Sequence, residues 1–400
     1  DYLMFLWAAL MVGTVALHQD PTSQIVGRLG LALDGLGLYL VFRLFCRSEA
    51  DIIFVCTALA LLLAPLGLLM VYEKASMHNL LSVFGGLPSA PLIRDGHVRA
   101  QGPFRHAILA GTIGALSVPF MAALWSTRRA IAAIGLIACL CIVVSSTSSG
   151  PFMSLAIGLV SLALWPFRRH LYIARWACVT LYLALAVVMS RPPYFLMAKI
   201  DVAGGSTGWH RARLIQASLD HLNEWWLAGT DVTRHWMATG VTWSREQTDV
   251  TNHYIALGVL GGLPLLLSFL GVIALAFYHV SQRLRIDDAQ PASSFLAWAL
   301  GSALFTIVIT SVSISYFDQS ILWVYMTIAC CRTIAIDATA QDSVPATQNI
   351  SAPTYRARRR ARERAASAAV DVVRPPAAVQ ARRRRRARLQ HDDALQATRR

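Results

Sequence analysis

Residues 253–279 read HYIALGVLGGLPLLLSFLGVIALAFYH, an apolar run without a single Asp, Glu, Lys or Arg. Because a helix of about 20 apolar residues crosses the hydrocarbon core of a bilayer, this run predicts a transmembrane helix. The segment 261–264 inside it contains two glycines and a proline, which predict a bend or thinning of the helix.

The rest of the chain has the same apolar character. Hydrophobic residues make up 56% of the 400 residues and charged residues only 14%, whereas charged residues approach about a quarter of a soluble protein. We expect an all-α polytopic membrane protein, with seven spans in residues 1–190 and three in residues 253–336. The chain begins at Asp1 without a basic leader, so we expect no cleavable signal peptide and allow for a helix that precedes the first one. The apolar runs predict about ten spans, at about 2–17, 29–42, 52–72, 106–125, 131–148, 151–166, 172–190, 253–279, 292–313 and 319–335.

The distribution of Lys and Arg predicts the orientation in the membrane. One set of alternate loops has nine Lys or Arg in 34 positions, at 43–50, 126–130, 167–175 and 280–291. The other set has five in 50 positions, at 18–28, 74–105, 149–150 and 314–318. Since Lys and Arg accumulate in short cytoplasmic loops, we expect the first set and both termini to be cytoplasmic. The long segment 191–252 and the loop 74–105 then face outward.

The segment 191–251 is the longest hydrophilic interruption of the apolar sequence. We expect residues 207–227 to form an amphipathic helix, capped by Ser206 or Thr207, that rests its apolar side on the membrane body. The segment contains five of the eleven tryptophans, Trp209, Trp225, Trp226, Trp236 and Trp243. The first three are candidates to stack on a sugar, and anchoring at the membrane interface is the alternative interpretation.

Arg211 and Arg213 fall on different faces of this predicted helix. Arg213 shares the polar face with acidic residues and is expected to be solvated, whereas Arg211 lies on the apolar face. A buried, unpaired guanidinium is costly unless an anion meets it. Arg211 is therefore the candidate for a substrate phosphate and for catalysis. The alternative is an internal salt bridge to Asp231 or Asp249.

His253 is expected in the first turn of the helix that follows, because Thr251 or Asn252 can cap it. The positive end of a helix dipole favours the neutral imidazole that a general base requires. His253 is therefore the second catalytic candidate, with Asn252 beside the substrate. The alternative is an interfacial histidine bonded to a backbone group.

Further residues of the outward loops are candidates for contact with an anionic substrate. They are Arg94, Arg99, Arg105 and His210. For each arginine, simple solvation is the alternative interpretation. The spacing of His210, His221 and His235 does not predict a metal site, and the seven cysteines lie in or beside apolar runs. We therefore expect no metal and no cofactor.

Three motifs occur in order along the chain. They are Gly102-Pro103-Phe104-Arg105-His106 followed by Gly111, Trp209-His210-Arg211-Ala212-Arg213-Leu214 running to Glu224-Trp225-Trp226-Leu227-Ala228-Gly229-Thr230, and Thr251-Asn252-His253-Tyr254 followed by Gly258 and Gly261-Gly262. Their order and sidedness, over roughly residues 50–335, resemble the O-antigen ligase and polysaccharide polymerase superfamily of bacterial inner-membrane glycosyltransferases. The chain departs from the family pattern at 145–150, which lacks an arginine, and at 229–231, which reads Gly-Thr-Asp in place of a Gly-x-Gly-like turn.

The resemblance implies a helical membrane fold with an outward-facing cavity, in the bacterial inner membrane. It implies a glycan on undecaprenyl pyrophosphate as substrate, with Arg211 on the pyrophosphate and His253 activating the acceptor hydroxyl, and no metal or nucleotide sugar. Envelope-polysaccharide assembly proteins are candidate partners. An arginine that binds the leaving pyrophosphate better as charge develops lowers the barrier, and we expect inversion at the anomeric carbon.

Two other classes of function are alternatives. A polysaccharide or lipid exporter predicts internal pseudo-symmetry and polar residues near the middle of the membrane, and the sequence has little of either. A non-catalytic scaffold for envelope assembly predicts that loss of Arg211 or His253 leaves glycan assembly intact.

The C-terminal residues 337–400 are expected to form a disordered cytoplasmic tail. Residues 356–400 contain 15 Arg and 4 acidic residues, which account for +11 of the net charge of +14. Such a tail binds anionic membrane lipid by charge, and we expect no specific nucleic-acid partner.

Overall fold

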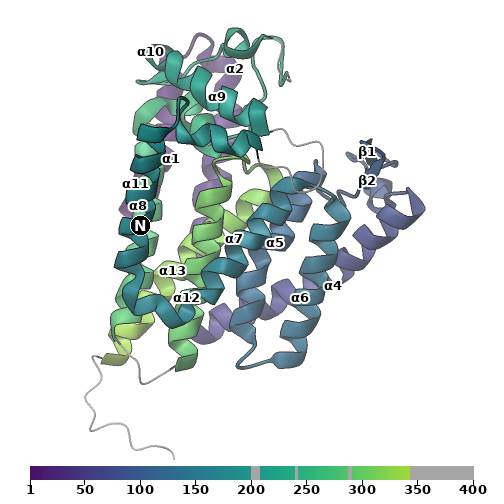
Figure 1. Ribbon diagram of the computed structural model, residues 1–400, viewed down its shortest axis with the longest axis vertical. Coiled ribbons are helices and arrows are strands. Elements are labelled where there is room, and N and C mark those ends of the chain that lie inside the picture. The colour runs from purple at the N-terminus through teal and green to yellow at the C-terminus, as the bar shows by residue number, and fades with distance from the viewer. Residues whose placement is uncertain (200–207, 239–241, 287–290, 343–400) are drawn as a thin grey trace, which may run out of the picture. The chain divides into compact units, whose positions relative to one another are not determined.

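The computed structural model describes residues 1–199, 208–238, 242–286 and 291–342. This part of the chain is mostly helical (Figure 1). It belongs, apart from its last two residues, to the first of two compact units, Asp1–Ala340. Most of the predicted tail, residues 343–400, and the predicted helix caps Ser206 and Thr207 lie outside the described residues.

The α-helices are α1 Tyr2–Gly13, α2 Pro21–Ala32, α3 Leu38–Phe45, α4 Glu49–Ser76, α5 Ala107–Leu124, α6 Arg129–Ser146, α7 Ser149–Ala163, α8 Leu171–Val188, α9 Gly208–Asp220, α10 Leu222–Trp225, α11 His253–Ile286, α12 Pro291–Thr310 and α13 Ile321–Asp342. A π segment, η2 Leu33–Gly37, joins α2 to α3. Short 3-10 segments are η1 Thr14–Leu17, η3 Leu80–Phe84, η4 Trp165–His170, η5 Pro193–Lys199, η6 Arg234–Met237 and η7 Asp318–Ser320.

The described part has the helices of a multi-pass membrane protein. Two helix pairs within 149–199 are long and apolar enough to cross a membrane only if each pair is taken as one span, and the pairs are bent by 73° and 86°. The number of possible spans is therefore seven, or up to nine if each bent pair counts as one, where the sequence predicted about ten. The predicted spans 151–166 and 172–190 lie in these bent pairs, and the first predicted span is an apolar helix of fewer than 18 residues. The seven are Pro21–Phe45, Glu49–Ser76, Ala107–Leu124, Arg129–Ser146, His253–Arg285, Ala292–Thr310 and Asp318–Ile336.

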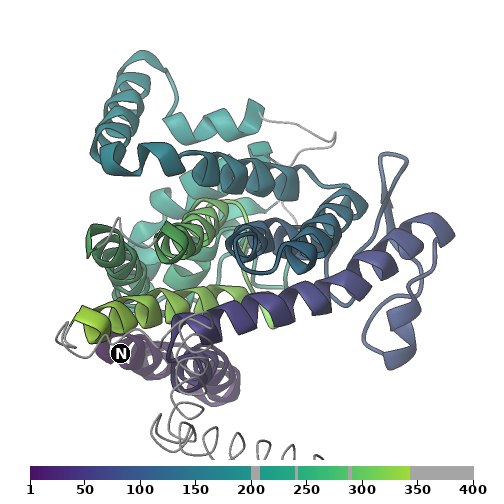
Figure 2. The ribbon, with the colours of Figure 1, turned by 90° about the horizontal axis from the view of Figure 1, so that it is seen from below.

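Loops from the two alternate sets meet at opposite ends of the helices, and the membrane side of each end stays a prediction. At one end the start of α4 meets the end of α11, where Arg283 Nε lies 3.4 Å from a Glu49 carboxylate oxygen. At the other end the Ala100 N–H donates to the Ser145 carbonyl over 3.1 Å. We call this second end the loop end, because it also carries α9 and α10 (Figure 1). In Figure 2 the long α4 lies at a steep angle to the bundle of α5, α6 and α7.

Two hydrophobic clusters hold this arrangement. The larger one runs through the long helices from α1 to α13. The smaller one lies at the loop end, where α9, α10 and η6 pack on the first turns of α11, and contains Leu214, Ala217, Trp225, Trp236, Met237, Ile255 and Val259. This second cluster fixes α9, the helix that carries Arg211, against the helix that begins at His253.

The loop before α5 contains a β-hairpin, which is an exception to the all-α prediction. Strands β1 Leu92–Arg94 and β2 His97–Arg99 pair antiparallel, with Arg94 opposite His97 and Leu92 opposite Arg99. Asp95 and Gly96 join them with φ of 51° and 76°, the conformation of the two-residue hairpin turns that favour Asp-Gly. Arg94 lies two positions from Leu92 and so on the same face of the hairpin, and Leu92 shares that face with Arg99, which is directly opposite. Arg94 and Arg99 therefore lie on the same face.

Helix α11 is broken where the sequence predicted a bend. Gly262 has φ 70° and ψ −170°, which interrupts the helical backbone. The Val259 carbonyl beside the break accepts a bond of 2.9 Å from the Thr230 N–H. The Leu260 carbonyl accepts from the buried Arg28 guanidinium. A Cβ on Gly262 would lie 2.4 Å from the Leu227 carbonyl carbon, so only glycine fits this crossing.

Candidate functional site

The first motif is held in place by a buried carboxylate. Glu73, near the end of α4, accepts the N–H of Gln101 over 3.1 Å and the N–H of Gly102 over 2.8 Å. The Asn79 side-chain amide donates to the Gly102 carbonyl over 2.9 Å. Gly102 itself has φ 57°, which favours glycine. These bonds fix the chain where it enters α5, so that Arg105 is exposed at the loop end.

One hairpin arginine, Arg99, reaches the short turn between α6 and α7. The buried Arg99 donates through Nη2 to the Ser148 hydroxyl. Burial and the neighbouring Arg94 lower the pKa of Arg99, while Asp95 opposes this effect. The turn 145–150, which has no arginine of its own, therefore receives a guanidinium from the preceding loop.

Arg211 and Arg213 are separated as the helical period predicted. Arg213 is exposed, whereas Arg211 is largely withdrawn from solvent. Burial and then Arg94 lower the pKa of Arg211, and Arg99 acts in the same direction. Asp249 is the carboxylate that opposes this shift. Among the described residues no carboxylate oxygen forms an ion pair with Arg211 within 4.0 Å, so the internal salt bridge is not formed.

Asp249 is the carboxylate that interacts with Arg211 and with two neighbouring histidines. Burial raises its pKa, although His210, His106 and Arg211 all act to lower it. Burial likewise lowers the pKa of His210 and of His106, which favours neutral imidazoles at pH 7. His106 comes from a segment more than one hundred residues before His210 and Arg211, and Asp249 interacts with all three.

Several buried polar atoms in these segments have no hydrogen-bond partner. They are Arg99 Nε, Gln101 Nε2, His210 Nε2, Arg211 Nε, Thr251 Oγ1 and His253 Nε2. Buried polar groups in folded proteins are nearly always bonded, and those that are not need an explanation. Five of these atoms carry N–H groups in at least one of their forms, which is the chemistry that receives an anion.

Aromatic rings line the same segments. The Arg105 guanidinium lies 5.2 Å from the ring centroid of Trp243. Phe317 contacts both the Trp243 ring at 6.0 Å and the His106 ring at 6.1 Å. Trp243, His106 and Asp249 were not among the predicted site residues. His106 could have been found, because it ends the first motif, but the pairing of Trp243 with Arg105 has no local signal.

The predicted tryptophans differ in their surroundings. Trp225 is only 5% exposed, belongs to the second hydrophobic cluster, and donates from Nε1 to the Ser218 carbonyl over 2.8 Å. Trp209 and Trp226 are 58% and 50% exposed. Trp225 therefore has a packing role in the structure, whereas Trp209 and Trp226 keep their ring faces accessible.

His253 stands at the start of α11, as predicted. The Asn252 side-chain carbonyl accepts the N–H groups of Tyr254 and Ile255 over 2.9 and 3.0 Å, which confirms Asn252 as the helix cap. The Asn252 amide also donates to the Val312 carbonyl. Its side chain thus serves to place the helix, and a substrate contact by Asn252 stays a prediction.

The imidazole of His253 is buried in an aromatic environment. Its ring lies 5.4 Å from Phe269 and 5.5 Å from Tyr316. Nδ1 lies 3.4 Å from the Tyr316 N–H that it accepts, so the neutral ring carries its proton on Nε2. The contacts of the described residues do not join His253 directly to the arginines, and the prediction that both act on one molecule stays a prediction.

Together, the loop end brings Arg94, Arg99, Arg105, His106, His210, Arg211 and Asp249 into one electrostatic network. We call these seven residues the arginine cluster.

Comparison with models of known protein families gives no match for this chain, and comparison with curated proteins gives none either.

Proposed function

We propose that this chain is a membrane glycosyltransferase that transfers or polymerises glycan from undecaprenyl pyrophosphate onto an acceptor hydroxyl, on the periplasmic side of the bacterial inner membrane. The observation that carries the proposal is the arginine cluster, which gathers cationic and unpartnered donors at the loop end of membrane-type helices. The motif resemblance to O-antigen ligases and polysaccharide polymerases supplies the chemical class of the substrate.

The arginines are suited to a pyrophosphate. Guanidinium groups bind phosphate oxygens with two parallel N–H bonds, and they stay charged when buried. Arg211 and Arg99 each keep an Nε–H without a partner. In this proposal they take up the negative charge that develops on the leaving pyrophosphate. Arg99 supplies, through its position on Ser148, the charge that the turn itself lacks.

Two residues are candidates for the proton acceptor. His253 is the residue that the motif resemblance selects, but the Tyr316 bond to Nδ1 leaves its Nε2 as a donor. Asp249 belongs to the arginine cluster, and a buried carboxylate with a raised pKa accepts a proton more readily than an ordinary one. We therefore assign the general base to Asp249 and keep His253 as the alternative.

Aromatic side chains provide contacts for sugar rings. Trp243 is held between Arg105 and Phe317 and is 52% exposed. Trp209 stands directly before His210 and Arg211 on the same helix. A sugar attached to the pyrophosphate would have these two rings as stacking partners near the charged cluster.

The Lys and Arg distribution supports a periplasmic loop end with both termini cytoplasmic. The basic tail, residues 356–400, would then face anionic lipid of the inner leaflet and contribute roughly 1 kcal/mol per basic residue near the surface. The proposal includes envelope-polysaccharide assembly proteins as partners and no specific nucleic acid.

The test is turnover by the purified chain with an undecaprenyl-pyrophosphate glycan and an acceptor. Wild type, Arg211→Ala, Asp249→Asn, His253→Ala and the matched control Arg213→Ala are compared. We expect Arg213→Ala to retain activity and Arg211→Ala to lose at least about tenfold, since one charge-assisted contact is worth roughly 1.5–3 kcal/mol.

The outcomes separate the alternatives. Loss in Asp249→Asn with activity in His253→Ala supports Asp249 as base, and the reverse supports His253. Product formed in detergent, where no compartments exist, argues against a pure exporter. If the wild-type chain forms no product, or if Arg211→Ala and Arg213→Ala are equally active, the proposed glycosyl transfer by this site is wrong.

A further inference from the structure

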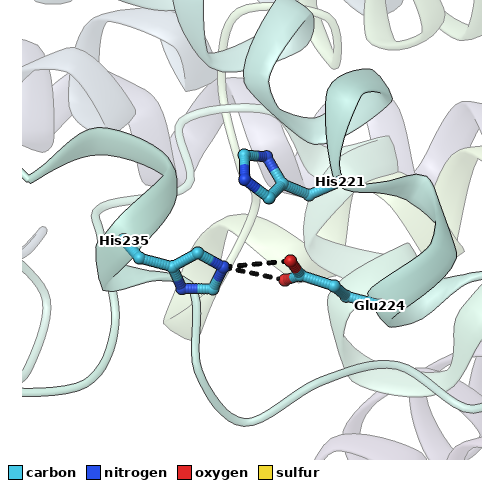
Figure 3. Close-up of side chains that lie close together, drawn as sticks. All are labelled: His221, Glu224 and His235. Atoms are coloured by element: carbon cyan, nitrogen blue, oxygen red, sulfur yellow. Dashed lines mark hydrogen bonds and ion pairs between the residues drawn. The ribbon is translucent and has the colours of Figure 1, made fainter.

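Three side chains next to α10 form a group with the composition of a transition-metal site. The ligand atoms of His221, Glu224 and His235 all lie within 4.8 Å of one another (Figure 3). His221 and Glu224 are three positions apart and so project from the same side of the α10 turn. His235 comes from η6, so the group joins two separate elements.

The His221 imidazole is oriented as a metal ligand is. Its Nδ1 lies 2.8 Å from the Ala217 carbonyl, to which it donates, and this bond leaves the Nε2 lone pair free in the neutral ring. Ligating histidines almost always donate their other ring N–H to a carbonyl or carboxylate in this way. The ring is also stacked on Trp236, with centroids 5.8 Å apart and planes at 22°.

The Glu224 carboxylate is oriented by Trp236, a residue that is not itself a candidate ligand. Its Oε2 accepts from Trp236 Nε1 over 2.9 Å, while His235 Nε2 lies 2.9 Å from the same oxygen. Trp236 therefore holds the carboxylate beside the His235 imidazole.

We propose that His221, Glu224 and His235 bind one divalent transition ion of the Zn²⁺ class, with water in the fourth position. Two imidazoles and one carboxylate are typical Zn²⁺ ligands, at about 2.0–2.2 Å from the ion, and leave an open position. Imidazole ligands disfavour Mg²⁺ and Ca²⁺, which prefer oxygen.

Binding needs only a small rearrangement. In tetrahedral coordination at these bond lengths the ligand atoms are roughly 3.4 Å apart. His235 Nε2 and Glu224 Oε2, now 2.9 Å apart, must separate slightly, while any pair nearer the 4.8 Å limit of the group must close. The proton between His235 and Glu224 moves to His235 Nδ1, and the ion takes its place between Nε2 and the carboxylate. The side chains of His235 and Glu224 are 46% and 30% exposed, so the ion has access from solvent.

The ion would act as a clamp between α10 and η6, which contribute Trp225 and Trp236 to the second hydrophobic cluster. It would therefore stabilise the segment that carries Arg211 without contacting the substrate. The proposal is independent of the proposed glycosyl transfer, because its test measures metal binding and unfolding.

The test uses the full chain, purified in detergent with any affinity tag removed and stripped of metal by a chelator. It is titrated with Zn²⁺ against a competing chelator, with Mg²⁺ as the comparison ion. The matched control is His78→Gln, which removes an exposed histidine from another loop at the same end. We expect one equivalent of Zn²⁺ in the wild type and in His78→Gln, and more than 100-fold weaker binding in His221→Gln and His235→Gln. Trp236→Phe should weaken binding by roughly 10–100-fold, the usual effect of removing an orienting partner.

A second measurement does not depend on variants that fold. X-ray absorption of the Zn²⁺-loaded wild type should show two imidazoles and oxygen ligands, and Zn²⁺ should raise its Tm. Equal binding by wild type and by the His221 and His235 variants would overturn the proposal. So would absence of stoichiometric binding, or competition by Mg²⁺ at similar concentration.

Discussion

Replacement of Arg211 by methionine should separate the stability of the protein from its affinity for substrate. Methionine keeps an unbranched, flexible stem but removes the guanidinium. Arg211 forms no ion pair within 4.0 Å with a described carboxylate, and Arg94 and Arg99 are like charges that act on it. The free protein should therefore lose little when the charge is removed.

The magnitudes follow from this environment. Replacing buried ionic groups by apolar side chains of similar volume is often neutral or stabilising by about 1–4 kcal/mol. We expect the Tm of Arg211→Met to be unchanged or raised by a few degrees. Loss of one charge-assisted contact of roughly 1.5–3 kcal/mol should weaken the affinity for a polyprenyl pyrophosphate by about 10-fold to 150-fold.

The assay measures both quantities on the same purified protein. Thermal unfolding is followed with and without undecaprenyl pyrophosphate, and affinity is obtained from the dependence of Tm on ligand concentration. Arg213→Met is the matched control, because Arg213 is exposed two positions further along α9. It should change neither quantity.

The opposite pattern would refute the reasoning. A fall in Tm of several degrees with unchanged affinity would mean that Arg211 is a structural cation. Equal effects of Arg211→Met and Arg213→Met would mean that burial of Arg211 has no functional consequence.

Three further predictions concern the surroundings of the site. Asp249→Asn should tighten pyrophosphate binding by roughly tenfold at pH 7, because it removes a negative charge near the anion. Acid protonates Asp249 in the wild type and so removes the difference in affinity, and this should occur at a higher pH than for an ordinary carboxyl, because burial raises the pKa of Asp249. A constant difference in affinity between pH 7 and pH 4 would contradict this. Gly262→Ala should lower the free energy of unfolding by about 1–3 kcal/mol. The control Gly271→Ala should not, because its added Cβ would lie 3.6 Å from the nearest atom. Similar Tm values for the two variants would contradict the close approach of Gly262 to the Leu227 backbone. Glu73→Gln should lower Tm, because the amide cannot accept both backbone N–H groups, at a cost of about 1–3 kcal/mol; a Tm equal to that of wild type would show that these bonds are dispensable.

The membrane helices could be predicted because the thickness of the bilayer requires runs of about 20 apolar residues, which are visible in the sequence. The break in α11 could also be predicted, since two glycines and a proline occur together at 261–264. The bends within 149–199 were not predicted, although prolines lie beside both of them: Pro166 follows the first break, and Pro192 and Pro193 stand at the second. The Asp95-Gly96 turn was a local signal for the hairpin that the apolar pattern alone does not report.

Part of the site could be predicted from helical period alone. The burial of Arg211 and the exposure of Arg213 follow from their separation by two positions. The partners of Asp249 could not be predicted, because His106 comes from a segment more than one hundred residues away. The same holds for the burial of Trp225, which depends on α11 packing against it through Gly258.

The break at Gly262 makes α11 two mechanical bodies within one helix. Thr230 and Arg28 hold its first body to the loop end, while the longer second body runs on to Arg283 and Glu49 at the far end. The second hydrophobic cluster joins α9 and α10 to this first body, and the non-helical backbone at Gly262 separates both from the far end.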